Sequence, residues 1–434
     1  MSVLTLRGFL ESLKSRPIQS YVEPHLKQLN IVCGNESADF DSVSSALSYA
    51  YFDYLYKQQQ QEQLYEGTST KNKKCNPLLP VINIPREDLK LRKDIVLMLN
   101  KEYCISEDLL YFQDDLITWK SDKQLTINAV LVDHNELVNK SLELVDNVTG
   151  VVDHHVDATL YMKADPRIIK VTGSCTSLVM NYWYNLIEDK SSMVDMIKFM
   201  YGALLLDTAN FRHKVEAPDR SALNHYYEIS GGFETSTTMF NRIDFKSTGD
   251  DGFFKTLKKA KKDIKGLSVR DVIRKDYKQF VFDLSGTNGD RMIVGIGSMV
   301  KSLKWLYKQY DGINQFRKEC DLFREGNQLD LLVIMSSYND KTQDMFTREM
   351  GLVCSSEKKE IVSSMIKGMI PLLKLEPWQK NSNNDNNDDN DDSQSLDRTE
   401  GSLSQSCFWE FRQLNVEASR KQAVPIMKQI LGHL

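Results

Sequence analysis

The first half of the chain alternates short apolar runs with longer stretches of helical character. Five apolar runs are predicted to be strands, at residues 29–33, 81–84, 129–132, 148–152 and 168–171. Short, continuously apolar runs are typical of strands that helices cover on both faces of a parallel sheet. Residues 42–57 follow the first run and are predicted to form a crossover helix, which Asp41 or Ser42 can cap. Residues 1–223 are therefore predicted to form an α/β domain.

The second half has a different pattern. Residues 224–262 are polar and helical in character, which predicts a linker between two domains. Strands are predicted at 279–284, 292–298 and 331–336, with a helix at 300–309, so residues 263–434 form a second, smaller α/β domain. Residues 279–284 alternate between polar and apolar, which indicates an antiparallel or mixed sheet. The Asn/Asp-rich segment at about 379–403 cannot bury a core and is predicted to be an acidic low-complexity insertion.

Composition narrows the class of protein. The 434 residues are 41% hydrophobic and 26% charged, as in ordinary globular proteins. No apolar run is long enough to span a bilayer, and the N-terminus does not resemble a secretion signal, so no membrane association is expected. Seven scattered cysteines without a CxxC pair indicate a reducing compartment. We expect a cytoplasmic protein. The basic amphipathic residues 1–16 leave a mitochondrial matrix pool open, although Glu11 favours a surface helix.

Charge is distributed unevenly along the chain. Residues 379–400 carry a net charge of −5, which equals the net charge of the whole sequence. Residues 255–308 hold 14 Lys and Arg against five Asp, a net charge of +9. Lys301, Lys304 and Lys308 are spaced to share one helix face. Such a cluster on an otherwise neutral protein suggests a polyanionic partner, and a solvated lysine face is the alternative.

Acidic residues follow several of the apolar runs of the first domain. They are joined by two histidines and an asparagine: Asn35, Asp39, Asp41, Asp133, Asp153, His154, His155 and Asp207. Because the carboxyl ends of parallel strands meet at one edge of a sheet, these side chains should converge there. Carboxylates with one or two imidazoles suit Mg²⁺ or Mn²⁺. Several carboxylates together make a pair of ions plausible, the usual arrangement for phosphoryl hydrolysis.

These residues resemble the motifs of a known superfamily. Taken in order, the DxD at 39–41, Asp133, the DHH at 153–155 and Asp207 resemble the four motifs of the DHH phosphoesterase superfamily. "LNVEASRKQAVP", at 414–425, resembles the C-terminal signature shared by family II inorganic pyrophosphatases and fungal cytosolic exopolyphosphatases. "GNESADFDS", "NIPREDLKLRKD" and "GSCTSLVMNYWY" resemble the fungal exopolyphosphatase branch. The resemblance implies a parallel-sheet DHH domain, a C-terminal phosphate-binding domain, and an active site in the cleft between them.

The resemblance also implies roles for single residues. One Mg²⁺ or Mn²⁺ ion would be held by four ligands: Asp41, Asp133, His154 and Asp207. Asp133 would bridge to a second ion, which Asp39 also serves. Asp133 and His155 would be catalytic, with His155 contacting a phosphate oxygen or the leaving group. The expected substrate-binding residues are Asn35, His155, Lys278, Lys301, Lys304, Arg420 and Lys421.

The function implied is that of an exopolyphosphatase, which releases terminal orthophosphate from inorganic polyphosphate by two-metal activation of water. Sliding of the chain along the basic segment makes a processive reaction a hypothesis. The alternatives are an inorganic pyrophosphatase of the same scaffold, which would usually carry His at position 35, and a non-enzymatic scaffold protein. Polyphosphate is the expected partner. Nucleic acid is not expected as a partner, and the chain is expected to be a monomer.

Overall fold

The chain folds into two compact units, Met1–Asp263 and Ile264–Leu434. The computed structural model describes residues 4–23, 25–65, 76–122, 124–230, 251–284, 290–340, 342–378 and 406–433. The acidic insertion predicted at about 379–403 lies outside the described residues, as do residues 231–250 of the predicted linker. Helix α9 (Asp251–Lys261), from the described part of that linker, packs against α3 (Lys93–Leu97) and belongs to the first unit.

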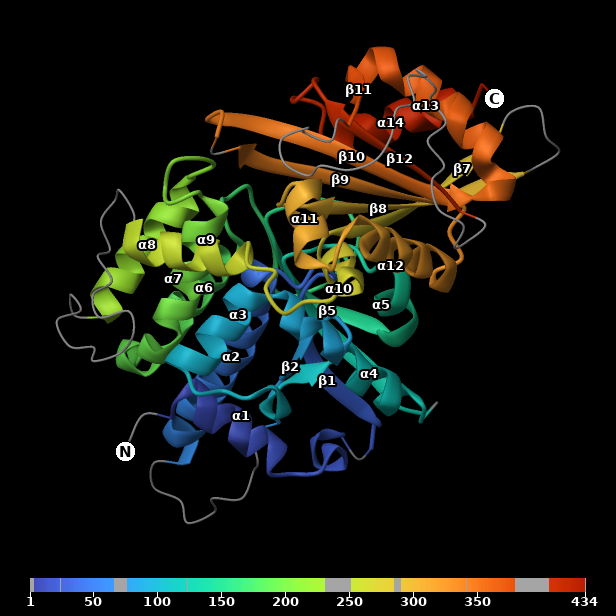
Figure 1. Cartoon of the computed structure of the whole chain (residues 1–434). Helices are drawn as coiled ribbons and strands as arrows, with labels where there is room; N and C mark the ends of the chain where they lie inside the picture. Colours follow the sequence, from blue (N-terminus) through green and yellow to red (C-terminus); the bar gives the residue numbers. More distant parts are fainter. Residues whose placement is uncertain are drawn as a thin grey trace, which may run out of the picture. The chain divides into compact units, whose positions relative to one another are not determined.

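A sheet of six parallel strands forms the centre of the N-terminal unit (Figure 1). Its strands are β1 (Gln28–Cys33), β2 (Leu79–Ile82), β3 (Tyr111–Phe112), β4 (Thr126–Val132), β5 (Asn147–Asp153) and β6 (Arg167–Ile169). The five predicted strands and the parallel α/β fold are confirmed. The pattern missed β3 because two residues are too few to show a period.

The strand order of this sheet is β3-β2-β1-β4-β5-β6, so the chain reverses its direction of winding between β1 and β4. In open α/β sheets, ligands bind outside the carboxyl ends of the strands at such a reversal. The ends of β1, β4 and the neighbouring β5 are therefore the place where fold geometry alone favours a site.

Helices cover both faces of this sheet, as Figure 1 shows. They are α1 (Leu6–Lys14), α2 (Phe40–Tyr65), α3, α4 (Gln113–Lys120), α5 (Asn139–Leu144), α6 (Cys175–Leu186), α7 (Ile197–Asp207), α8 (Ala217–Ile229) and α9. α2, α6, α7 and α8 pack together on one side, whereas α4 and α5 lie on the other. The predicted crossover helix is confirmed as α2, which extends beyond the predicted end. Among the described helices, none has both the length and the apolar character needed to cross a membrane.

The C-terminal unit contains a mixed sheet of six strands in the order β11-β12-β10-β9-β8-β7. They are β7 (Tyr277–Asp283), β8 (Arg291–Met299), β9 (Leu331–Asp340), β10 (Met345–Ser355), β11 (Leu375–Pro377) and β12 (Ser406–Gln413). Only the β8–β9 pairing is parallel among those described, which confirms the predicted mixed sheet.

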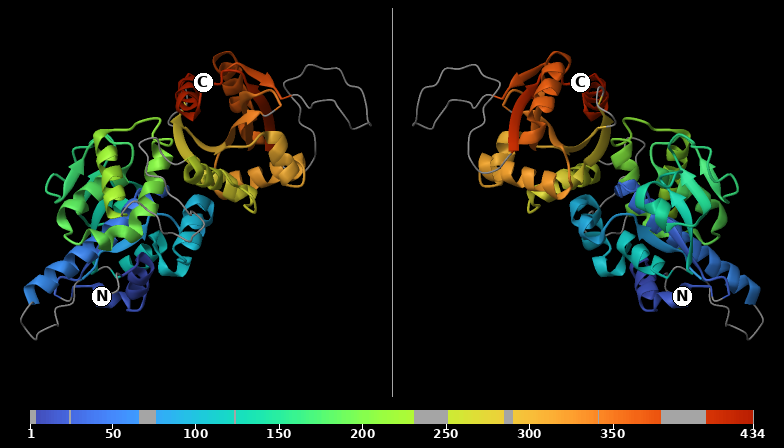
Figure 2. Two further views of the ribbon diagram at one scale, coloured as in Figure 1. Left: turned by 90° about the vertical axis from the view of Figure 1, so that its left-hand side faces the viewer. Right: turned by 90° about the vertical axis from the view of Figure 1, so that its right-hand side faces the viewer.

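Five helices cover the mixed sheet: α10 (Val269–Lys275), α11 (Leu303–Gln309), α12 (Ile313–Gly326), α13 (Lys359–Leu373) and α14 (Arg420–Leu431). α13 and α14 pack together on one face, and the group of α10, α11 and α12 covers the other (Figure 2). The core of this unit lies under α13 and α14, where alternate strand residues such as Met292, Val294 and Ile296 are fully buried.

The turn from β1 into α2 depends on a close approach at Gly34. A Cβ atom on this residue would lie 2.2 Å from the Ser42 Oγ and 3.1 Å from the Ser42 carbonyl oxygen. The Ser42 hydroxyl occupies that space because it accepts a hydrogen bond from the Asn35 backbone N–H at 2.8 Å. Glycine therefore allows the end of β1 to lie against the start of α2, and this contact shapes the loop of residues 35–41.

We expect Gly34→Ala to lower the free energy of unfolding by about 1–3 kcal/mol, the usual cost of forcing an extra methyl group into a packed interior. Gly351→Ala is the matched control, because its Cβ would meet Ile334 at an ordinary contact distance of 3.7 Å. Urea unfolding followed by circular dichroism measures both. An equal effect of the two substitutions would contradict the close approach at Gly34.

Candidate metal centre

Three neighbouring strands bring the predicted acidic residues to one edge of the N-terminal sheet. β1 is followed by the loop that carries Asp39 and by the first turn of α2, which carries Asp41. β4 is followed by Asp133, and β5 ends at Asp153. Direct contacts link these strand ends. The Asp133 carboxylate lies 3.1 Å from His154 Nε2, and His154 Nε2 lies 3.9 Å from the Asp41 carboxylate. The expectation that the strand ends converge is thus met for these residues.

Asp133 lies at the centre of this group. It is 2% exposed, and its backbone has a left-handed φ of +63°, a conformation that costs energy for any residue with a side chain. Burial raises the pKa of Asp133 well above its ordinary value, and the negative charges of Asp41 and Asp39 raise it further. A strained, buried carboxylate among like charges is typical of a functional site.

The orientation of His154 is fixed by one hydrogen bond. Its Nδ1 lies 3.0 Å from the Thr172 carbonyl oxygen, which can only accept a hydrogen bond. Nδ1 therefore carries a proton, and in the neutral ring Nε2 offers a lone pair toward Asp133 and Asp41. An imidazole held in this way by a backbone carbonyl is the usual form of a metal-ligating histidine.

The N-terminus of α6 faces Asp41. The buried carboxylate accepts hydrogen bonds from the Ser174 hydroxyl at 2.6 Å and from the backbone N–H groups of Cys175 at 2.6 Å and Thr176 at 3.0 Å. Burial nevertheless raises the pKa of Asp41, and the neighbouring His154 lowers it in part. The first turn of α6 therefore compensates one negative charge without neutralising the cluster.

Asp207 does not follow a strand, so the interpretation of its apolar run as another strand end was wrong. It is the last residue of α7, a helix buried over most of its surface, which explains the continuous apolar run. Burial raises the pKa of Asp207 well above its ordinary value, and the charges of Asp41 and Asp39 raise it further. The Asp207 carboxylate is therefore within electrostatic reach of Asp41 and Asp39, although it comes from a helix.

Asp39 lies in the loop before α2, where its carboxylate accepts a hydrogen bond from the Ser42 backbone N–H at 3.1 Å. Its negative charge raises the pKa of Asp41, Asp133 and Asp207. All five predicted metal ligands are therefore electrostatically coupled to one another or in direct contact.

Asn35 meets this cluster through its amide nitrogen. Its Oδ1 accepts the backbone N–H groups of Ser37 and Ala38, which fixes the identity of that atom as oxygen. Its Nδ2 donates to the Asp133 carboxylate at 2.7 Å. The side chain of Asn35 therefore faces Asp133 with its nitrogen, while its oxygen is occupied by the loop.

His155 is held by Asp153, which was expected at the sheet edge but was given no role there. His155 Nδ1 lies 2.8 Å from the Asp153 carboxylate, and this hydrogen bond raises the pKa of His155. Asp153 is fully buried and also accepts from the His154 backbone N–H and the Asn135 side chain. The DHH string itself was the available signal, because it places a carboxylate two residues before this histidine.

The chemistry of this cluster fits a divalent cation. Asp133, Asp153, His154 and His155 each offer a ligand atom, and these atoms lie within 4.8 Å of one another. Both Asp153 oxygens already accept hydrogen bonds, so this carboxylate orients its neighbours. Asp41 and Asp133 are buried and Asp39 and Asp207 are half-buried, so these four carboxylates place negative charge where water compensates it only in part. Oxygen ligands with one imidazole are the set that Mg²⁺ and Mn²⁺ bind.

The predicted basic residues lie at one end of the mixed sheet in the C-terminal unit. Lys278 is exposed near the start of β7, and Lys301 follows the end of β8, which runs antiparallel to β7. Arg420, at the start of α14, donates to the carboxylate of Asp276, directly before β7, at 2.7 Å. Lys421 is exposed beside it. The structure therefore gathers these residues in one region, with Arg420 held by an acidic neighbour.

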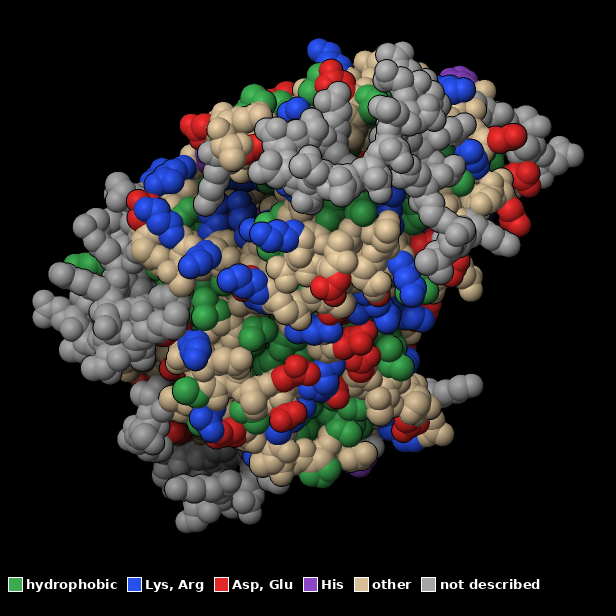
Figure 3. All heavy atoms as spheres, viewed as in Figure 1, with side chains coloured by type: hydrophobic (Ala, Val, Ile, Leu, Met, Phe, Trp, Pro, Cys, Tyr) green, Lys and Arg blue, Asp and Glu red, His purple; other side chains and the backbone are tan. Residues whose placement is uncertain are grey.

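Lys301 does not share a helix face with Lys304 and Lys308. The Ser302 hydroxyl accepts a hydrogen bond from the Trp305 backbone N–H, so α11 begins at Leu303, after Lys301. The ammonium of Lys301 lies 5.2 Å from the centroid of the Trp305 ring. Lys304 and Lys308 are exposed on α11. In Figure 3, basic side chains (blue) gather over α9 of the N-terminal unit and near α11 of the C-terminal unit.

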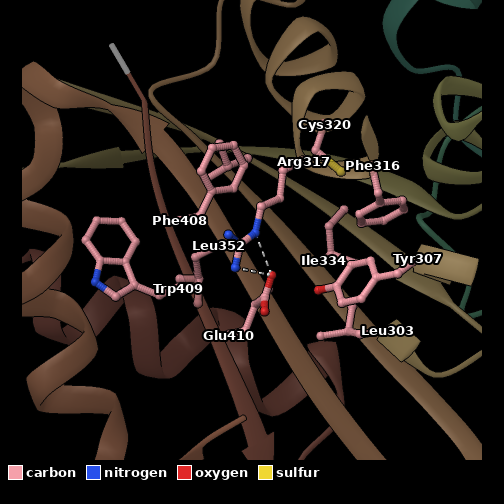
Figure 4. Close-up of a pocket in the computed structure, with 12 residues that line it drawn as sticks. Leu303, Tyr307, Phe316, Arg317, Cys320, Ile334, Leu352, Phe408, Trp409 and Glu410 are labelled. Atoms are coloured by element: carbon pink, nitrogen blue, oxygen red, sulfur yellow. Dashed lines mark hydrogen bonds and ion pairs between the residues drawn. The ribbon is translucent and has the colours of Figure 1, made fainter. Parts of the chain in front are cut away.

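A hollow in the C-terminal unit lies between the sheet and the helices α11 and α12 (Figure 4). Its volume of about 20 Å³ has room for about one water molecule. Arg317 from α12 and Glu410 from β12 form an ion pair of 3.0 Å beside the apolar side chains that line it. This hollow is too small for a phosphate chain, so the carboxylate cluster remains the candidate site.

Comparisons with known proteins cover both units. A model of the DHH family N-terminal domain matches residues 30–206, and a model of the DHHA2 domain matches residues 255–430. A Schizosaccharomyces pombe protein named "Putative exopolyphosphatase" is 30% identical over 413 residues, which cover 92% of this chain and 90% of that protein. Proteins named exopolyphosphatase PRUNE1 from Mus musculus and Homo sapiens are 26% and 24% identical, covering 94% of this chain and 76% of theirs.

We expect divalent cations to stabilise the protein. A carboxyl whose folded-state pKa is raised stabilises the fold at low pH, and that contribution is lost as the pH rises through the folded pKa. At neutral pH, Asp41, Asp133 and Asp207 therefore oppose folding until a cation compensates them. Adding Mg²⁺ or Mn²⁺ should raise the melting temperature, with a gain of about 2.7 kcal/mol at a hundredfold excess over Kd.

Asp207→Asn tests whether this residue belongs to the cluster. The substitution removes one of the mutually repelling charges, so the metal-free variant should melt at the same temperature as the wild type or higher. Its gain on adding Mn²⁺ should be clearly smaller, because one ligand is lost. Differential scanning calorimetry with and without a chelator measures both values. A full metal-dependent gain in this variant would exclude Asp207 as a ligand.

Proposed function

Because the chain belongs to the DHH phosphoesterase superfamily, we propose that it is an exopolyphosphatase, a hydrolase that removes the terminal phosphate of inorganic polyphosphate as orthophosphate. One observation carries the proposal: proteins named exopolyphosphatase match the chain over at least 92% of its length, across both units. The cluster of carboxylates and histidines at the switch point of the N-terminal sheet supports it, because hydrolysis of a phosphoanhydride needs a site that compensates strong negative charge.

We propose that the cluster holds two or more Mg²⁺ or Mn²⁺ ions. One ion would be held by Asp41, Asp133, His154 and Asp207, and a second by Asp39 together with Asp133. Bound ions would supply Lewis-acid polarisation of the phosphate oxygens and would make a water molecule more acidic. Asp133 is the natural shared ligand, because it contacts His154 directly and its pKa responds to both Asp39 and Asp41.

His155 would meet the reacting phosphate. Its side chain is 58% exposed, in contrast to the buried carboxylate of Asp153 that holds its Nδ1. Because this hydrogen bond raises the pKa of His155, the charged imidazolium is favoured, and its Nε2–H can donate to a phosphate oxygen or to the leaving group. Asp133 and His155 are thus the proposed catalytic residues.

Basic residues would bind the rest of the polyphosphate chain. Lys278, Lys301, Lys304 and Lys421 supply ammonium charges, and Arg420 supplies a guanidinium that matches two phosphate oxygens. The Arg420 guanidinium forms an ion pair with Asp276, so a phosphate would compete with this carboxylate for the guanidinium. Binding along several such residues would let the shortened chain slide forward for another round, which makes the reaction processive.

The proposal also covers the oligomeric state, the compartment and the partners of the protein. We propose that it acts as a monomer in the cytoplasm, with a mitochondrial matrix pool as the alternative, and that nucleic acid is not a partner. The metal-ligand positions Asp39, Asp41, Asp133, His154 and Asp207 are all intact, which speaks against a non-enzymatic scaffold.

Phosphate release should be measured side by side on long-chain polyphosphate, pyrophosphate and single-stranded DNA, with Mg²⁺ or Mn²⁺. We expect polyphosphate to be the preferred substrate, with long and fully degraded chains but few intermediates on a gel if the reaction is processive. Activity on pyrophosphate alone would refute the proposal in favour of a pyrophosphatase. An even ladder of intermediate lengths would refute processivity only.

Asn35→His should raise pyrophosphate hydrolysis relative to polyphosphate hydrolysis. Asn35 now donates to Asp133 through its amide nitrogen, whereas an imidazole at this position can offer a lone pair to a borderline metal such as Mn²⁺. Asn35→Ala is the control, because it removes the same hydrogen bond without adding a ligand. If Asn35→His leaves the ratio of the two activities unchanged, the residue has no part in substrate choice.

A further inference from the structure

A buried carboxylate outside the metal cluster, Asp219, accepts four hydrogen bonds. It lies in the first turn of α8 and is fully buried. Its Oδ1 accepts from the hydroxyls of Thr172 and Ser177, both at 2.7 Å, and its Oδ2 accepts from the backbone N–H groups of Gly173 and Glu216, both at 2.8 Å. Only the bond to Glu216 serves the capping of α8. Two of the other three hold Thr172 and Gly173, which lead into α6, and the third holds Ser177 in the first turn of that helix.

The same segment contacts two proposed metal ligands. The Thr172 carbonyl oxygen accepts the hydrogen bond that fixes the ring of His154. The next residues, 174–176, donate three hydrogen bonds to the carboxylate of Asp41. Residues 172–176 therefore lie between Asp219 on one side and His154 and Asp41 on the other.

Gly173 packs this segment closely against the chain that follows a third proposed ligand, Asp207. A Cβ atom here would lie 2.6 Å from Thr208 Cγ2 and 2.6 Å from the Lys214 carbonyl oxygen. Thr208 directly follows Asp207, and Lys214 lies in the loop between α7 and α8. The backbone of Gly173 is thus packed against the chain around Asp207 and cannot shift toward it. Movement of the segment away from Asp219 would disturb its contacts to His154, to Asp41 and to Thr208, the residue after Asp207.

We propose that Asp219 is a positioning residue of the metal centre: by fixing residues 172–176, it holds His154 and Asp41 in the orientation that binds the cation. The inference rests on the metal centre of the proposed function and adds to it a residue that touches neither metal nor substrate. Partners in this position commonly change metal affinity by a factor of about 10–100 when they are removed.

Asp219→Asn tests the proposal. The amide keeps the shape of the side chain, but its nitrogen would face two hydrogen-bond donors that then lack an acceptor. We expect the Kd for Mn²⁺, measured by titration calorimetry on the full chain, to rise about 10–100-fold. Saturating Mn²⁺ should restore most of the polyphosphate hydrolysis, because the lost step is metal binding.

Asp195→Asn is the matched control. Asp195 is another carboxylate of the same unit, and it accepts a hydrogen bond from the Leu6 backbone N–H at 2.6 Å, at the start of α1. This variant should keep the wild-type Kd for Mn²⁺, because Asp195 has no contact with residues 172–176 among the described residues. If Asp219→Asn behaves in the same way, Asp219 has a structural role only and the proposal is wrong.

Thr172→Val covers the case in which Asp219→Asn does not fold. It removes one hydrogen bond to Asp219 at nearly constant shape, so a weaker Mn²⁺ affinity supports the proposal and an unchanged affinity overturns it. The wild-type protein separates this inference from the proposed function. Mn²⁺ binding without phosphate release from polyphosphate would refute the function alone, whereas failure to bind Mn²⁺ would refute the positioning role as well.

Discussion

Mutual repulsion among buried carboxylates is the constraint on which the N-terminal unit depends. Asp41 and Asp133 are buried and Asp207 is half-buried, and the charges of Asp39 and Asp41 act on the others. Charges at close range repel one another much more strongly in such a place than in water. The surrounding fold compensates only part of this charge, through the first turn of α6 and the amide of Asn35. The remainder is what a divalent cation would neutralise.

The topology of the sheet explains why this repulsion arises at one place. The reversal between β1 and β4 brings the carboxyl ends of these strands together, and the chain leaves β4 there through the left-handed backbone of Asp133. At these strand ends, buried groups orient the candidate ligands. Asp153 orients His155, and the segment before α6 orients His154 and Asp41. Each of these orientations depends on hydrogen bonds to buried groups.

The basic residues of the C-terminal unit differ from the carboxylates because they gather at its surface. Lys278, Lys301 and Arg420 come from separate elements, and the antiparallel pairing of β7 with β8 brings those elements to one sheet end. The exposed lysines there repel one another only weakly, because water screens them. This surface therefore needs no internal compensation, apart from the pairing of Arg420 with Asp276. The N-terminal unit therefore gathers carboxylates that are largely shielded from water, whereas the C-terminal unit gathers basic residues at its surface.

Much of the fold could be predicted from the sequence, because the evidence for it is local. Apolar runs of strand length marked β1, β2, β4, β5 and β6, and the alternation at the start of the second domain indicated its mixed sheet. The sequence pattern gave a wrong or missing prediction where it is compatible with more than one kind of secondary structure. The apolar run before Asp207 fits a buried helix as well as a buried strand, and β3 is too short to show a period. Lys301 was placed on a helix that a capping serine starts two residues later.

The sequence by itself determined which carboxylates and histidines follow the strands, and hence the class of chemistry at the candidate site. Only the tertiary structure decided how these groups are used. In the folded chain, the nitrogen of Asn35 faces Asp133, and the Asp153 carboxylate is hydrogen-bonded to His155. Thr172 contacts both Asp219 and His154. The physical reason is that a hydrogen bond depends on the position of both partners, and these partners are separated by up to 98 residues in the chain. Residue spacing determines what can be present at a strand end, whereas packing determines which atom faces which.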